Sequence, residues 1–213
     1  MKNTNTFTLF ALFFLVAITT HLPSATAQPV LDTEGNPLRN GGTYYILPVI
    51  RGFGGGIELA QTGNDTCPLT VALSRSEVSD GIPITISSLF RILFVTERSP
   101  LELSFSDTDL PSCIPTPPKW NIVKGETAEG WSIKVTDDDS EQEPGWFYIQ
   151  KYDYGAKFYQ LVFRSHDDAV SGDIGIDFDS DGTKRLVVTR YNKYPFLVQF
   201  KLADDDSSRS VAA

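Results

Sequence analysis

The chain has 213 residues, of which 41% are hydrophobic and 21% charged, and its formal net charge is −9 at pH 7. This acidic balance argues against nucleic acid or an anionic membrane surface as a partner, because both are negatively charged. The two cysteines and two histidines form no Cys/His motif, so we expect neither a bound metal nor a cofactor.

The first 27 residues are typical of a secretory signal peptide. Lys2 gives a positive end, residues 7–18 form an apolar run of 12 residues, and Ala25 and Ala27 are the small residues that signal peptidase requires. The run is too short to span a membrane. Its removal leaves residues 28–213, with 186 residues and a net charge of −10, which we expect to form one soluble domain.

Short aromatic and β-branched segments recur along this domain, separated by Gly, Pro, Asn and Asp. Several alternate apolar and polar residues, which is the period of a strand with one buried face. The predicted strands are residues 43–47, 57–61, 69–73, 91–96, 101–105, 120–123, 131–135, 147–151, 158–163, 174–178, 185–189 and 196–201, and residues 84–86 also have strand character. Since no amphipathic helical pattern lasts three turns, the sequence predicts an all-β barrel or sandwich.

The connections between these strands have recognisable turn chemistry. Residues 40–42 (Asn-Gly-Gly) precede the first strand, and Asp181-Gly182 is a good hairpin turn. Residues 137–143 are predicted to form an acidic loop, and the polar tail, residues 203–213, is predicted to be disordered. No clean threefold repeat is visible in the sequence.

Cys67 and Cys113 are predicted to form a disulfide, because a secreted chain folds in an oxidising compartment. The alternative is a free catalytic cysteine, which lacks a nearby histidine in the sequence to activate it. The sequon at residues 64–66 makes Asn64 a candidate glycosylation site.

Three interpretations as a metal site or an enzyme have little support. Asp177, Asp179 and Asp181 imitate the start of a calcium loop, but no helices flank them and Val188 stands where the closing glutamate belongs. Only His166 remains after signal removal, and there is no Gly-x-Ser-x-Gly element for a serine hydrolase. No pair of carboxylates stands out for a glycosidase. We therefore do not expect an enzyme.

Residues 87–94 (Ser-Ser-Leu-Phe-Arg-Ile-Leu-Phe) place one long cation, Arg91, among apolar side chains. A trypsin-like protease recognises an arginine held on a loop, because the guanidinium pairs bidentately with a carboxylate in a deep pocket. The alternative is an ordinary strand-end arginine whose head lies in water.

Eight sequence blocks extend this observation to almost the whole of the domain. They are residues 30–47 (VLDTEGNPLRNGGTYYIL), 62–71 (TGNDTCPLTV), 86–94 (ISSLFRILF), 115–120 (PTPPKW), 159–163 (YQLVF), 172–175 (GDIG), 181–188 (DGTKRLVV) and 197–200 (LVQF). In this order they resemble the plant Kunitz-type protease inhibitors, the soybean trypsin inhibitor family. The resemblance implies a β-trefoil, with twelve strands in three pseudo-equivalent units.

The resemblance also implies a role for individual residues. The reactive bond would join Arg91 and Ile92, with Asn40 holding the loop from behind and Cys67–Cys113 as the first disulfide of the family. The residues that would contact the protease beside this bond are Ser88, Leu89, Phe90, Leu93 and Phe94. The implied protein is a secreted or vacuolar monomer that inhibits trypsin-like serine proteases without a cofactor.

The sequence departs from the family pattern at several positions. Arg164 and Ser171 stand where many members have a second disulfide, and Leu89 stands where the best-known members have proline. Leu93 replaces a basic residue that can occur there. These departures motivate an alternative, a non-inhibitory β-trefoil acting in storage, stress response or carbohydrate binding.

Overall fold

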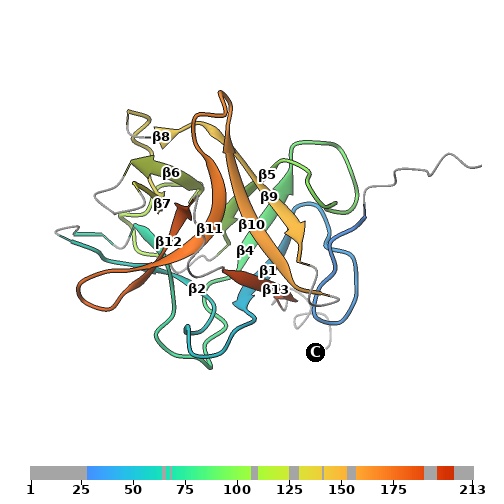
Figure 1. Cartoon of the computed structure of the whole chain (residues 1–213), viewed down its shortest axis with the longest axis horizontal. Helices are drawn as coiled ribbons and strands as arrows, with labels where there is room; N and C mark the ends of the chain where they lie inside the picture. Colours follow the sequence, from blue (N-terminus) through green and yellow to red (C-terminus); the bar gives the residue numbers. More distant parts are fainter. Residues whose placement is uncertain are drawn as a thin grey trace, which may run out of the picture.

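The computed structural model describes residues 28–63, 66–67, 69–106, 110–124, 130–140, 142–152, 157–189 and 196–203. Within these ranges the chain forms thirteen strands and no helix, which confirms the all-β prediction (Figure 1). The strands are β1 (Gly42–Pro48), β2 (Ile57–Ala60), β3 (Thr70–Leu73), β4 (Ile84–Ser88), β5 (Leu101–Phe105), β6 (Trp120–Lys124), β7 (Trp131–Val135), β8 (Gln142–Glu143), β9 (Gly145–Lys151), β10 (Tyr159–Ser165), β11 (Ser171–Phe178), β12 (Lys184–Thr189) and β13 (Leu197–Leu202). The predicted signal peptide, Asn64 and residues 204–213 of the predicted tail lie outside the described residues.

Six antiparallel strands close into a barrel. Around the ring, β1 pairs with β4, β4 with β5, β5 with β9, β9 with β10, β10 with β13, and β13 with β1. Because the last pairing returns to the first strand, the barrel presents no free strand edge.

Three hairpins, β2–β3, β6–β7 and β11–β12, complete the architecture. Their second strands, β3, β7 and β12, pair with one another and so form a triangular cap. The chain therefore repeats one four-strand pattern three times, which is the arrangement of a β-trefoil. The thirteenth strand, β8, is a two-residue addition that pairs with β6.

The core follows from the alternation in the sequence. In β5, Leu101, Leu103 and Phe105 are buried, whereas the polar residues between them are only partly covered. The rings of Phe147 and Phe163, which are paired on the neighbouring strands β9 and β10, lie 5.5 Å apart. Full burial of a side chain of this size contributes about 1.5–3 kcal/mol, so the barrel interior provides a rigid base for the loops at its ends.

Two expectations about strands are wrong. Residues 91–96, predicted as a strand, belong to a loop that makes only isolated bridges, at Phe94 and Thr96. Only Val95 of this segment faces the core, whereas Leu93 is 71% exposed and Phe94 38% exposed. The predicted acidic loop at residues 137–143 contains β8.

The predicted disulfide is confirmed, since Cys67 and Cys113 are bonded with their Cα atoms 6.1 Å apart. It links the segment before β3 to the connection between β5 and β6. Among the described residues there is no helix long and apolar enough to cross a membrane.

Candidate functional site

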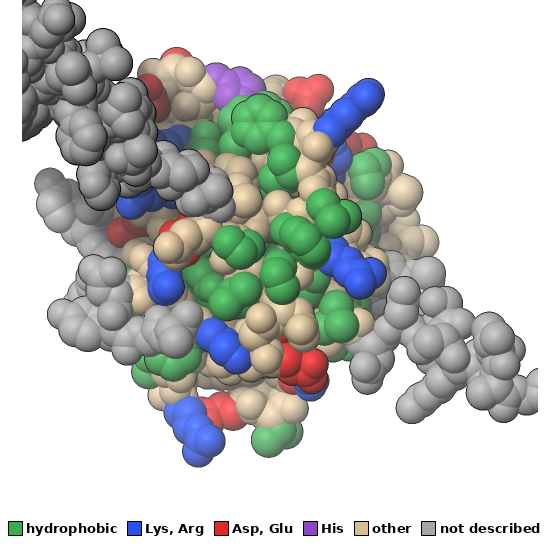
Figure 2. Space-filling view, turned by 90° about the vertical axis from the view of Figure 1, so that its right-hand side faces the viewer, with side chains coloured by type: hydrophobic (Ala, Val, Ile, Leu, Met, Phe, Trp, Pro, Cys, Tyr) green, Lys and Arg blue, Asp and Glu red, His purple; other side chains and the backbone are tan. Residues whose placement is uncertain are grey.

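The connection between β4 and β5, residues 89–100, is the most exposed apolar part of the described chain. It holds four of the eight large hydrophobic side chains that are exposed within the described residues, namely Leu89, Phe90, Leu93 and Phe94. Figure 2 views the molecule from the side on which this loop lies in Figure 1, and hydrophobic side chains gather in the middle of that face. Contiguous exposed apolar side chains of this kind mark a surface that binds another protein.

One asparagine joins the two sides of the loop tip. The Nδ2 group of Asn40 donates to the carbonyl oxygens of Phe90, at 3.2 Å, and Ile92, at 3.0 Å. Its Oδ1 atom accepts a hydrogen bond from the backbone N–H of Ser88 at 2.7 Å. The three bonds fix the backbone on both sides of Arg91 to a residue about 50 positions earlier in the chain.

Backbone hydrogen bonds of the tight turn at residues 39–42 hold Asn40 in position beside the loop. The Asn40 N–H donates to the carbonyl of Leu93 at 3.0 Å, and the Gly41 N–H donates to that of Ile86 at 2.8 Å. Gly41 has φ of +76°, a conformation that favours glycine. A Cβ atom on Gly42 would lie 3.0 Å from the carbonyl oxygen of Arg39. The predicted Asn-Gly-Gly turn therefore serves to present Asn40 to the loop.

Short bonds within the loop shape the segment around Arg91. The Phe90 N–H donates to Ser88 Oγ at 3.2 Å, and the Ile92 N–H donates to the Phe90 carbonyl at 2.9 Å. Arg91 is exposed and forms no ion pair with any other described residue. Its guanidinium is thus presented on an ordered backbone and is available to a carboxylate of a partner.

The return segment of the loop is anchored on two other parts of the chain. Val95 is fully buried, its N–H donates to Leu38 at 2.8 Å, and its carbonyl accepts from Val30 at 3.0 Å. Further along, the Arg98 N–H donates to the carbonyl of Ile149 in β9 at 2.9 Å. The loop is therefore ordered by the N-terminal segment and by the barrel.

Tyr159 holds the N-terminal segment in place, a role that sequence reasoning missed. Its hydroxyl accepts a hydrogen bond from the Leu31 N–H at 2.9 Å, across 128 positions. Burial raises the pKa of the Tyr159 phenol above its usual value. No local pattern in the sequence signals a contact over that separation.

The acidic and histidine motifs have structural roles. The Arg185 guanidinium lies 2.9 Å from Asp177 and 3.6 Å from Asp179, so these carboxylates neutralise a cation of the protein itself. The described residues contain no group of three or more side chains suited to hold a metal ion. The His166 ring packs against Trp146, with the ring centroids 5.1 Å apart.

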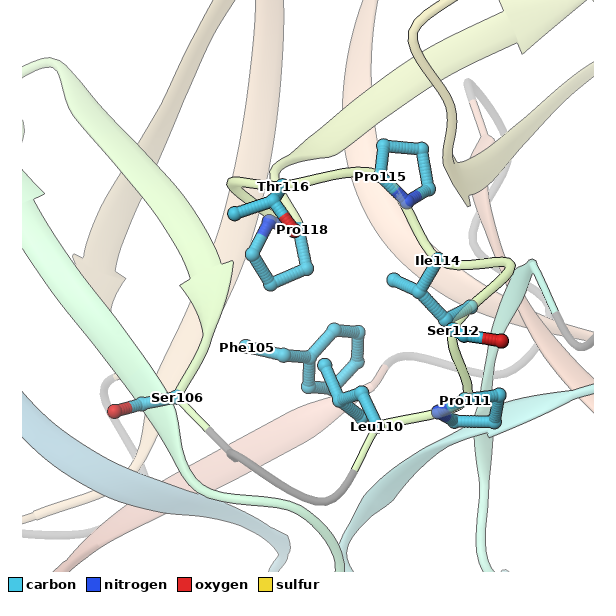
Figure 3. A pocket seen from close by; sticks show the side chains of 9 residues that line it. All are labelled: Phe105, Ser106, Leu110, Pro111, Ser112, Ile114, Pro115, Thr116 and Pro118. Carbon is cyan, nitrogen blue, oxygen red and sulfur yellow. The ribbon is translucent and has the colours of Figure 1, made fainter.

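A separate pocket of about 410 Å³ lies beside Cys113, at the end of β5 distant from loop 89–100 (Figure 3). Its walls include the side chains of Phe105, Leu110 and Ile114 together with three prolines. It contains none of the predicted site residues. Residues 107–109 of the same connection lie outside the described residues.

Comparison with known proteins places these features in a family. The legume Kunitz family, described as trypsin and protease inhibitors, matches residues 30–202. Trypsin inhibitor A of Glycine max is 47% identical over 94% of this chain and 93% of its own length. A chymotrypsin inhibitor of Erythrina variegata is 44% identical over 78% of this chain and 92% of its own length.

A solved structure gives the corresponding likeness in three dimensions. The soybean trypsin inhibitor in complex with porcine pancreatic trypsin is 44% identical, with a TM-score of 0.73, and the match covers 83% of this chain and 100% of that inhibitor. Together with the barrel and its triangular cap, this likeness confirms the prediction of a β-trefoil.

Proposed function

The chain belongs to the legume Kunitz family of trypsin and protease inhibitors, and from this premise we propose that it binds its target protease through the Arg91–Ile92 bond. The protein is an inhibitor of trypsin-like serine proteases and not an enzyme. The alternative of a non-inhibitory trefoil is not favoured, because relatives similar over most of the chain are named as trypsin inhibitors.

Arg91 is proposed to enter the primary specificity pocket of the protease. A trypsin-like pocket holds an aspartate at its base, which pairs with a planar guanidinium. Ser88, Leu89 and Phe90 would contact the protease on one side of the reactive bond. Leu93 and Phe94 would contact it on the other side, where their exposure leaves apolar surface to be buried.

We call the three hydrogen bonds from the Asn40 side chain to Ser88, Phe90 and Ile92 the Asn40 clamp. This clamp is the observation that supports inhibition over simple proteolysis. A loop that is already ordered loses little conformational entropy on binding, so more of the contact energy appears as affinity. Asn40 binds the carbonyls of both Phe90 and Ile92, one on each side of the bond to be cut. After cleavage it would keep both new chain ends in place, which favours re-formation of the peptide bond over release.

The route to the mature protein is a further part of this proposal. Removal of residues 1–27 would leave residues 28–213 as a single monomeric domain in the secretory pathway. The Cys67–Cys113 disulfide supports an oxidising destination, either the extracellular space or the vacuole. Asn64 is proposed as a glycan acceptor in the same pathway.

Substitution of Arg91 tests the assignment of the reactive bond. We expect Arg91→Ala to raise the trypsin inhibition constant by about 1,000-fold or more, equivalent to about 4 kcal/mol, because the central charged anchor is lost. Arg91→Lys should retain most of the inhibition, since it keeps the cation. Arg75→Ala removes an exposed arginine far from the loop and should leave the trypsin inhibition constant unchanged. An unaltered inhibition constant in Arg91→Ala would mean that another bond is used.

A further inference from the structure

Two more exposed arginines flank the loop tip, in a chain whose net charge is −9. Arg39 precedes Asn40 and pairs with Phe94 in an isolated bridge, so it lies beside the segment that leaves the reactive bond. Arg98 lies on the return segment of the same loop. With Arg91 and Glu97, the one acidic residue of loop 89–100, these residues carry a net charge of +2. Figure 2 shows basic side chains spaced around the hydrophobic ones on this face.

The backbone of Arg98 gives an independent reason to assign its side chain a role. Arg98 has φ of +60°, the left-handed conformation in which glycine or asparagine is the less strained choice. In this conformation its N–H donates to the carbonyl of Ile149 at 2.9 Å. Its guanidinium is exposed and forms no hydrogen bond or ion pair with another described residue. A residue held in a sparsely populated backbone conformation beside a binding loop is a reason to look for a function of its side chain.

We propose that Arg39 and Arg98 form a basic rim around the reactive loop that selects, among trypsin-like proteases, those with acidic side chains around the entrance to the active site. This inference rests on the proposed function, because it assigns the rim to the same bound protease. Arg91 recognises the pocket that all such enzymes share, whereas the rim distinguishes between them.

The physical basis of this selection is long-range attraction. The net charge of the protein repels an acidic protease, so a local cluster of positive charge is needed to orient the two molecules during encounter. Charges at the rim of an interface act mainly on the association rate and are screened by salt, because the Debye length is about 10 Å at 0.1 M. The rim should therefore affect how fast the complex forms more than how slowly it dissociates.

Stopped-flow association rates with an anionic and a cationic pancreatic trypsin test the proposal. For the anionic enzyme at about 20 mM salt, we expect the double variant Arg39→Glu/Arg98→Glu to associate at least about 10-fold more slowly than the native protein. The difference should shrink to about 2-fold at 0.5 M salt. With the cationic enzyme the same variant should associate as fast as the native protein or faster.

The matched control is Arg75→Glu/Lys184→Glu, which changes the net charge equally. Arg75 binds Asp181 in the hairpin between β11 and β12, and Lys184 begins β12; Figure 1 shows that hairpin on the side of the molecule opposite to loop 89–100. This control should alter either rate by less than about 2-fold. Equal slowing by both double variants would overturn the proposal, since net charge alone would then explain the effect.

Arg98→Gly is the second test, because glycine suits the φ of this position and the variant should fold at least as stably as the native protein. We expect a 2- to 4-fold slower association with the anionic trypsin and an unchanged thermal midpoint. Native rates in this variant, together with native rates in the double rim variant, would overturn the rim. Failure of the native protein to inhibit either trypsin would instead overturn the proposed function, so the two failures are distinguishable.

Discussion

The β4–β5 connection and the β10–β11 connection are held in opposite ways. Loop 89–100 is fixed by residues far away in the sequence, with Asn40 bonded across 50 and 52 positions and Val95 bonded to the N-terminal segment. The turn between β10 and β11 is fixed mostly by its own residues, with one longer-range bond from the His166 N–H to the Pro144 carbonyl at 3.0 Å. Ser165 Oγ donates to Asp167 at 2.7 Å and accepts from the Val170 N–H at 3.0 Å.

The difference separates two kinds of rigidity. A loop anchored on distant strands keeps its shape for as long as the whole fold persists, because its anchors belong to the core. A locally bonded turn can open without disturbing the rest of the molecule. Changes in global stability should therefore spare inhibition in the folded protein, whereas changes at the clamp should alter inhibition and leave the fold intact.

The largest expected effect is on stability alone. The double variant Cys67→Ser/Cys113→Ser opens a loop closed over 46 positions, which on the chain-entropy model costs about 4 kcal/mol. Denaturant unfolding should show this loss, while the trypsin inhibition constant at 25 °C stays within about 3-fold of the native value because Asn40 is untouched. A variant that is fully folded but inhibits trypsin 10-fold more weakly would contradict the claim that loop rigidity is independent of global stability.

The clamp should show the reverse behaviour. Asn40→Ala removes three hydrogen bonds to the loop, and we expect cleavage between Arg91 and Ile92 to accelerate about 100-fold, since loss of several such bonds is equivalent to about 2–3 kcal/mol. The matched control is Asn121→Ala, because the Asn121 Nδ2 group bonds the carbonyl of Thr136 at 2.8 Å in another part of the fold. The control should lose similar stability and keep native inhibition. Gel analysis of timed digests measures the cleavage rate.

A new disulfide across the β10–β11 connection should raise the stability of the protein without strengthening its inhibition of trypsin. Arg164 and Ser171 are direct partners across β10 and β11, and directly opposed residues in antiparallel strands lie at a separation that a disulfide can span. Arg164→Cys/Ser171→Cys should raise the free energy of unfolding by about 2.5 kcal/mol on the same entropy model. Chemical unfolding with and without reductant measures this gain. A large gain in inhibition would show that the two connections are coupled.

The smallest effects should come from pH. Stability should decrease at acidic pH through Asp167, in the β10–β11 turn, and at alkaline pH through Tyr159, behind loop 89–100. Hydrogen bonds from the Ala169 N–H and then from Ser165 lower the pKa of Asp167 below 3.8, so its contribution to stability is present above that pH and is lost as the pH falls further. Burial raises the pKa of Tyr159 above 10.0, so its contribution is present below pH 10 and is lost as the pH rises through the higher value. The free energy of unfolding can be measured from pH 3 to 11. In Asp167→Asn it should fall less steeply at acidic pH than in the native protein. In Tyr159→Phe it should fall less steeply at alkaline pH.

The general fold could be predicted because alternation reports burial directly. Leu101, Leu103 and Phe105 alternate with polar residues, and the structure buries all three. The same rule failed at residues 91–96, where Leu93 and Phe94 are exposed to solvent although Val95 is buried in the core. A local pattern cannot distinguish a side chain that packs inside its own fold from one exposed for a partner. β8 was missed because Gln142 and Glu143 are polar and pair only at the edge of β6.

Contacts between residues far apart in the sequence limit how much of the site could be predicted from the sequence. Arg91 could be singled out as a lone cation among apolar residues, and the family resemblance singled out Asn40. Tyr159 and Val95, which secure the segments behind the loop, gave no signal because their hydrogen-bond partners are remote in sequence. The threefold organisation was also hidden, because the three units share strand pairing and not sequence.

The central claim is that a clamped loop makes the Arg91–Ile92 bond inhibitory, and a titration of trypsin tests it most directly. Purified residues 28–213 would be added to active-site-titrated trypsin, with residual activity measured at each ratio and the products separated on a reducing gel. We predict that activity disappears at one equivalent and that the chain remains largely intact over hours. Rapid cleavage between Arg91 and Ile92 with full recovery of trypsin activity would contradict the claim, because the loop would then be an ordinary substrate.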